Sequence, residues 1–152
     1  MKLAALFFSL AAACTAPLAS AATYRIDDSM SLPRESTTAM KWRSIAPGRD
    51  MGYMVEGSNI VTVRLNLAPW LNKTGKIYMV LPEQPIGQVM AEWSTQGKLL
   101  PGQLVSGNRT LVYSGLIRSS LLEDTIVLKL SADGRRLIAP LSLQFYFEID
   151  VD

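Results

Sequence analysis

Histidine is absent from the 152-residue chain, and cysteine occurs once, as Cys14. Without histidine, the Ser-His-Asp and Cys-His arrangements of many hydrolases cannot be built. Zinc sites are nearly always built with histidine or cysteine, so the composition also disfavours a zinc enzyme. A single cysteine cannot close a disulfide within the chain. We therefore expect no cofactor and no metal, and a fold that is stabilised by its core alone.

A strong charge of either sign is also missing, because 15 basic residues face 13 acidic ones, for a formal net charge of +2. A nucleic-acid partner would favour a basic stripe, so we expect none. No apolar run reaches the roughly 20 residues that a membrane-spanning helix requires. We therefore expect no membrane span.

The N-terminus has the three parts of a secretory signal: Lys2, an apolar run from Leu3 to Ala13, and the small-residue site Ala19-Ser20-Ala21. We predict a cleaved signal peptide over residues 1–21. Removal of this segment leaves 131 residues with a net charge of +1, because Lys2 is its one charged residue. The predicted location is the periplasm or the cell surface.

An alternative interpretation of the same region is a degenerate lipoprotein signal, Leu10-Ala11-Ala12-Ala13-Cys14. In that case Cys14 would carry lipid and anchor the domain to a membrane. A lipobox usually has leucine three residues before its cysteine, and here that position is Ala11. The cleaved, soluble form is the preferred prediction.

Alternation of apolar and polar residues dominates the rest of the chain. It is clearest in residues 141–151, where Phe147, Ile149 and Val151 alternate with Glu148 and Asp150, and it recurs from Ile60 to Leu67. A period of two predicts strands with one buried face. Shorter segments of the same kind are Lys76 to Leu81, Gln88 to Thr95 and Thr125 to Ser131. Ala46-Pro47-Gly48 marks a turn before Met51 to Glu56.

Turn signals separate these segments at intervals of about 8 to 12 residues. Ser106-Gly107-Asn108 predicts a hairpin turn between Gln103-Leu104-Val105 and the segment from Arg109 to Tyr113. Helix signals are scarce, and the best is one short turn within residues 119–124. Residues 27–38 read as a loose polar arm.

The predicted fold is an all-β, antiparallel β-sandwich of about seven to nine strands, immunoglobulin-like in general plan and without a disulfide. The predicted organisation is a signal peptide at residues 1–21, an N-terminal arm at 22–38 and one β-sandwich domain at 39–152. This organisation resembles small exported β-sandwich modules of the bacterial envelope, some of which are pilus subunits.

Aromatic side chains are the candidate binding residues, because a flat apolar ring can stack on a sugar or anchor a protein partner. Trp70 falls in a turn between two strong strands, where it either is exposed or folds back over the end of the core. Trp42 and Tyr146 complete the proposed binding set. Trp93 shares a strand face with Val89 and Ala91, so we predict that it is buried.

Carboxylates offer two further hypotheses. Glycoside hydrolysis requires a pair of carboxylates. Glu56 and Glu92 are the candidate pair, and both are expected on the exposed faces of strands. Glu148, Asp150 and Asp152 share one strand face; a calcium site there is less favoured than a charged edge that discourages strand pairing.

The sequence therefore predicts an exported, non-enzymatic binding or assembly module of the bacterial envelope, related to pili or secretion. Its expected partner is another envelope or surface protein, bound by strand addition at a sheet edge. A carbohydrate-binding module that uses exposed tryptophan is the first alternative. A small carboxylate-dependent hydrolase is the second.

Overall fold

The computed structural model describes residues 22–33, 38–45, 52–85, 87–136 and 144–151. The predicted signal peptide, including Cys14, lies outside the described residues, and so do Asp152 and the start of the last predicted strand. Within the described ranges no helix is long and apolar enough to cross a membrane.

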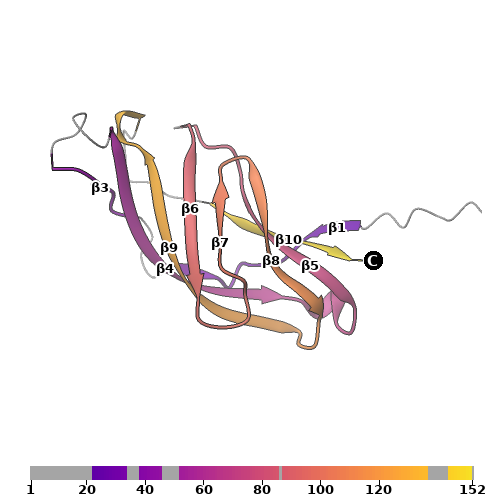
Figure 1. Ribbon diagram of the computed structural model, residues 1–152. Helices are drawn as coiled ribbons and strands as arrows, with labels where there is room; N and C mark the ends of the chain where they lie inside the picture. The colour runs from indigo at the N-terminus through magenta and orange to yellow at the C-terminus, as the bar shows by residue number, and fades with distance from the viewer. Residues whose placement is uncertain (1–21, 34–37, 46–51, 86, 137–143, 152) are drawn as a thin grey trace, which may run out of the picture.

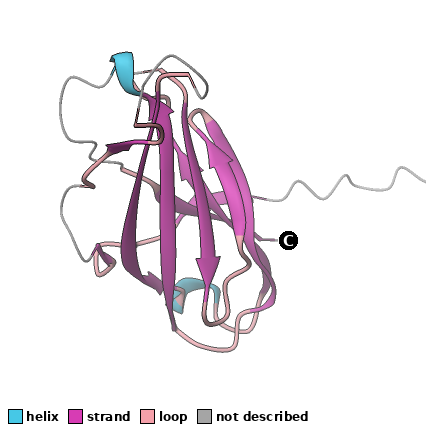
Figure 2. Cartoon of the chain, turned by 60° about the vertical axis from the view of Figure 1, so that its left-hand side comes forward, coloured by secondary structure: helices cyan, strands magenta, loops and turns pink. Residues whose placement is uncertain are grey.

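The described residues form antiparallel strands and two short 3₁₀ helices, η1 (Ala68–Trp70) and η2 (Gly134–Arg136), which lie at opposite ends of the molecule (Figure 2). The strands are β1 (Ala22–Arg25), β2 (Leu32–Pro33), β3 (Lys41–Trp42), β4 (Met54–Asn66), β5 (Thr74–Leu81), β6 (Val89–Thr95), β7 (Gly102–Val105), β8 (Asn108–Leu116), β9 (Leu121–Asp133) and β10 (Tyr146–Val151). The prediction of an all-β, antiparallel architecture is confirmed. The described strands number ten because the N-terminal residues add β1, β2 and β3.

The strands are divided between two sheets (Figure 1). The smaller sheet has the order β1-β10-β5-β8. The larger sheet has the order β2-β4-β9-β6-β7, and β3 also pairs with β4. β4 and β9 are long, curved partners that pair over their whole length, from Met54 opposite Asp133 to Asn66 opposite Leu121.

The core lies between the sheets and follows the predicted alternation. Val61, Val63 and Leu65 of β4 are buried, as are Phe147 and Ile149 of β10. Because side chains alternate across a strand, each apolar run presents every second residue to the other sheet. The burial of Trp93, which is 3% exposed, is confirmed.

The predicted helical turn in residues 119–124 is wrong, because β9 begins at Leu121. Leu122 and Asp124 both point inward from this strand and are buried. Asp124 accepts a hydrogen bond from the backbone N–H of Leu99 at 2.7 Å. Pairing with β4 and this buried contact therefore outweigh the local helix signal.

A turn is present at Ser106-Gly107, and Gly107 has the positive φ of 85° that such a turn favours. The predicted hairpin is wrong, because the strands on either side of the turn do not pair with each other. The two strands that it joins belong to different sheets: β7 pairs with β6, and β8 pairs with β5. The turn therefore links the sheets.

The predicted N-terminal arm (residues 22–38) and the residues that follow it as far as β3 lie along two sheet edges of their own molecule. β1 pairs with β10, and the chain then passes along β4 through the Asp27–Asn66 bridge, β2 and β3. Close approach is possible at Gly57, where an added Cβ would lie 2.7 Å from Thr38 Cγ2 and 2.9 Å from Ala39 O. The described part of the arm thus covers much of the β4 edge, which would otherwise be open to pairing.

Candidate functional site

The predicted site residues lie in three kinds of place: at the two sheet edges beside the N-terminal residues, on the outer face of the larger sheet, and in the turn between β4 and β5. Trp42 is on β3, Trp70 is in η1, and Tyr146 begins β10, so the three aromatic residues come from separate parts of the fold. Each has its own surroundings. The structure does not bring them together into one patch.

Trp70 is partly buried against the core, and its ring lies 6.0 Å from the ring of Tyr24, centroid to centroid. The turn that carries it is fixed by two backbone hydrogen bonds, Trp70 N to Leu67 O and Lys73 N to Trp70 O, both 3.0 Å. Of the two positions expected for Trp70, the structure has the ring folded back over the end of the core. Only a small part of the Trp70 ring is therefore exposed to solvent.

Tyr146 is half-buried, and one face of its ring is covered. The guanidinium of Arg25, on β1, lies 4.3 Å from the ring centroid, within the range of a cation–π contact. This contact joins the first and last described strands across the outer face of the smaller sheet.

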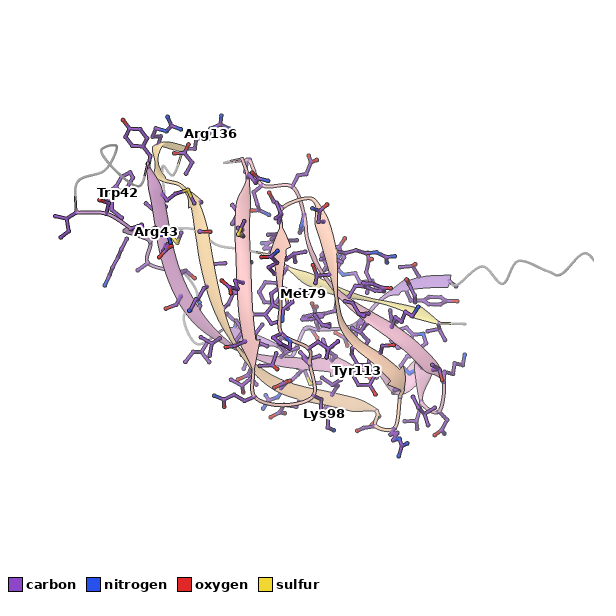
Figure 3. All side chains as sticks on the ribbon, viewed as in Figure 1. Trp42, Arg43, Met79, Lys98, Tyr113 and Arg136 are labelled. Carbon is purple, nitrogen blue, oxygen red and sulfur yellow. The ribbon has the colours of Figure 1, made fainter. Side chains whose placement is uncertain are left out.

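Trp42 is the exposed member of the set, at 48% of its surface. Its register partner on β4 is Val55, and its ring packs over Gly134, where an added Cβ would lie 2.6 Å from the ring. The rest of the ring is accessible at the edge of the larger sheet, beside Arg43 (Figure 3).

A shallow groove of about 710 Å³ runs from β3 across the outer face of β4, β9 and β6; we call it the β3 groove. Its lining includes Lys41, Trp42, Arg43, Glu56, Glu92 and Lys129. Arg43 forms an ion pair with Glu56 at 3.2 Å. Lys129 lies between Ser58 on one neighbouring strand and Glu92 on the other.

The structure thus places Glu56 and Glu92, the two carboxylates singled out for hydrolysis, in one groove, and both are exposed as predicted. They lie on β4 and β6, with β9 between them. Glu56 is opposite Ser131 and Glu92 is opposite Lys129. Two strand spacings across the sheet and two residues along it therefore put their backbones about 12 Å apart. Glu56 also has a cationic partner in Arg43.

On β10, the carboxylates of Glu148 and Asp150 contact other residues of the protein. Arg109, on β8, contacts Asp150 at 3.2 Å and Glu148 at 3.6 Å. Hydrogen bonding from the Thr23 hydroxyl, at 2.6 Å, and then from Arg109 lowers the pKa of the Asp150 carboxyl below its ordinary value. Among the described residues no group of three or more metal-ligating side chains is found.

The edge of the smaller sheet is the remaining candidate site, and sequence reasoning did not find β1. All four of its residues are exposed. The first buried residue of the N-terminal segment is Ile26, at 1%. Only weak alternation in residues 22–26 could have indicated a strand there.

Comparison of the chain with protein-family models, with curated proteins and with solved structures finds no match.

Proposed function

We propose that the protein is an exported, non-enzymatic binding or assembly module of the bacterial envelope, periplasmic or at the surface and related to pili or secretion. In this proposal, an envelope or surface protein adds a strand to the β10 edge, in the place that β1 occupies. An immunoglobulin-like arrangement of the two sheets is part of the proposal. It is supported by the two antiparallel sheets around one core.

The observation that carries the proposal is the weak hold of β1 on β10. The pairing spans four residues, from Ala22 opposite Val151 to Arg25 opposite Glu148. No side chain of β1 is buried, so its displacement would remove little apolar surface from the core. β10, in contrast, is fixed by β5 on its other side and by buried Phe147 and Ile149.

The side chains of β1 make surface contacts only. Thr23 donates to Asp150, Tyr24 touches Trp70, and Arg25 lies over Tyr146. Contacts of this kind are each worth on the order of 1 kcal/mol or less. A strand from another chain, with apolar residues at alternate positions, would replace the same backbone ladder and cover more of the core.

A reversible disulfide between β1 and β10 tests the proposal. Ile26 N donates to Phe147 O at 2.9 Å, so Thr23 and Asp150, three residues further along, form a non-hydrogen-bonded pair. Such pairs have Cα atoms about 4.5 Å apart, within disulfide range. In a Cys14→Ser background, the variant T23C/D150C should lock β1 when oxidised and release it when reduced.

Self-association is measured by light scattering. Binding of a partner is measured by capture of envelope proteins from the organism that produces this protein. We expect association in the reduced form and its loss in the oxidised form. The cysteine-free variant T23S/D150S, which lacks the Asp150 carboxylate as the test variant does, should respond to neither treatment. Equal association in both redox states would exclude the β10 edge. A domain that stays monomeric and captures nothing in either state would end the assembly proposal.

Carbohydrate binding in the β3 groove is the second candidate function. Trp42 is half exposed at the rim of the groove, and the groove is lined by both hydrogen-bond donors and hydrogen-bond acceptors. Glycan-array binding should be lost in Trp42→Ala and retained in Trp70→Ala, whose ring packs on the core. Binding that survives Trp42→Ala unchanged would remove this candidate.

A further inference from the structure

A second, smaller cavity of about 150 Å³ lies at one end of the molecule. Its walls come from the residue after β4, the loop between β6 and β7, Tyr113 of β8, the loop between β8 and β9, and the start of β9. Lys98 and Tyr113, which both line the cavity, lie at this end, away from Trp42 and Arg43 (Figure 3). The cavity is therefore separate from the β3 groove.

The floor of this cavity is apolar. Leu67, Ile117 and Leu122 are each at most 4% exposed, and Leu121, which also lines the cavity, is 39% exposed. The volume corresponds to about five water molecules, at roughly 30 Å³ each. The space therefore matches a short aliphatic group.

Two cations complete the lining, Lys98 from one loop and Arg118 from another. No carboxylate of the described residues forms an ion pair with either cation. Asp124, the buried acid nearby, accepts hydrogen bonds from Leu99 N and Thr125 N, both 2.7 Å. The Tyr113 hydroxyl donates to Leu116 O at 2.9 Å. Positive charge at the cavity is thus available to a ligand.

Both cationic loops are held in place by hydrogen bonds. Beyond Lys98, Leu99 is tied to Asp124, and Leu100 N donates to Val112 O at 2.7 Å. Before Arg118, Ile117 N donates to Lys73 O, and Ile117 O accepts from Asn72 N, both at 2.8 Å. The backbone beside both cations is therefore fixed next to the apolar floor, so binding a ligand does not have to order these loops.

We propose that this cavity binds an aliphatic carboxylate: its hydrocarbon fills the apolar floor and its carboxylate lies between Lys98 and Arg118. The matching chemistry is a free acid of about five or six carbons, or the C-terminal carboxylate of a polypeptide that ends in leucine or a similar residue. The two sources share the aliphatic group and the anion.

Titration of the ¹⁵N-labelled, full processed chain with 4-methylpentanoate tests the proposal. We expect saturable amide shifts confined to residues that line the cavity or adjoin it, namely 67, 97–100, 113 and 117–122. The variants Lys98→Gln and Arg118→Gln should each weaken binding about fivefold or more, as removal of one charge-assisted contact predicts. Lys76→Gln is the matched control, because Lys76 is an exposed cation of β5 that does not line the cavity, and it should leave the affinity unchanged.

Four comparison ligands separate the outcomes. Acetate that binds as tightly would mean a simple anion site, and 4-methylpentanol that binds as tightly would mean an apolar pocket; either result overturns the proposal, as does no binding at all. Two peptides ending in leucine, one with a free carboxylate and one amidated, then identify the source. Stronger binding by the free-carboxylate peptide than by 4-methylpentanoate assigns the site to a polypeptide end, and the reverse assigns it to a free acid.

Discussion

At the scale of single residues, Asp124 illustrates how one buried polar group organises a loop. It is 6% exposed, and its side chain accepts the N–H groups of Leu99 and Thr125. Gly97 passes so close that an added Cβ would lie 2.6 Å from Asp124 Oδ1. The β6–β7 loop, and with it Lys98, is therefore positioned by a residue of β9.

We predict that Asp124→Ala lowers the free energy of unfolding by about 1.5–3 kcal/mol, because two backbone N–H groups lose their acceptor, one of them buried. Urea denaturation measures the loss. Glu123→Ala is the neighbouring control: its carboxylate is paired with Arg64 at the surface, and its loss should be clearly smaller. Equal losses in both variants would contradict the role assigned to Asp124.

Asp133 gives a prediction about pH. Hydrogen bonds from the Arg135 side chain, and next from the Arg135 backbone N–H, lower the pKa of Asp133 from 3.8 to about 2. Because the folded pKa is depressed, this stabilisation is present above about pH 3.8 and is lost as the pH falls through 2. A carboxyl NMR titration should find the low pKa, and Arg135→Gln should raise it toward 3.8. Arg118→Gln, at the other end of the molecule, should not move it.

At the scale of elements, the N-terminal arm and β4 depend on each other at Gly57. A Cβ at this position would meet Met40 Sδ and Thr38 Cγ2 at 2.7 Å and a backbone oxygen, Ala39 O, at 2.9 Å. We predict that Gly57→Ala destabilises the protein by about 1–3 kcal/mol, since the arm must shift. Thermal denaturation measures the loss of stability, and Ser58→Ala, at the exposed neighbouring position, is the control. A Gly57→Ala protein as stable as Ser58→Ala would show that the arm contributes little.

At the scale of the whole molecule, stability is distributed unevenly among the strands. β4 and β9 pair over 13 residues each and carry much of the core, whereas β1 pairs over four residues and buries none of its side chains. Regions with few buried contacts open at low free energy. The edge where we propose strand addition is therefore expected to open first.

Native-state hydrogen exchange tests this order. We predict that the amide of Tyr24, in β1, exchanges faster than that of Val63, in β4, by on the order of 100-fold or more. Ile26, which is buried and bonded to Phe147 O, should be intermediate. Equal protection of Tyr24 and Val63 would mean that β1 opens only with global unfolding, and the edge proposed for strand addition would be closed.

The sequence by itself determined the strands with strong alternation, because side chains on a strand must point to opposite faces. Residues 60–67 and 147–151 follow that rule, and so does the burial of Trp93. The turn at Gly107 was equally predictable from the residue type that a positive φ favours.

Only the tertiary structure decided the rest, because it depends on which segments become neighbours. Local preference favoured a helical turn before Thr125, but pairing with β4 and the bond from Leu99 N made it strand. Lys98 and Arg118 are 20 positions apart in sequence, and Glu56 and Glu92 are 36 apart. Long-range pairing of the strands, rather than any local motif, brings each of these pairs to one cavity or groove.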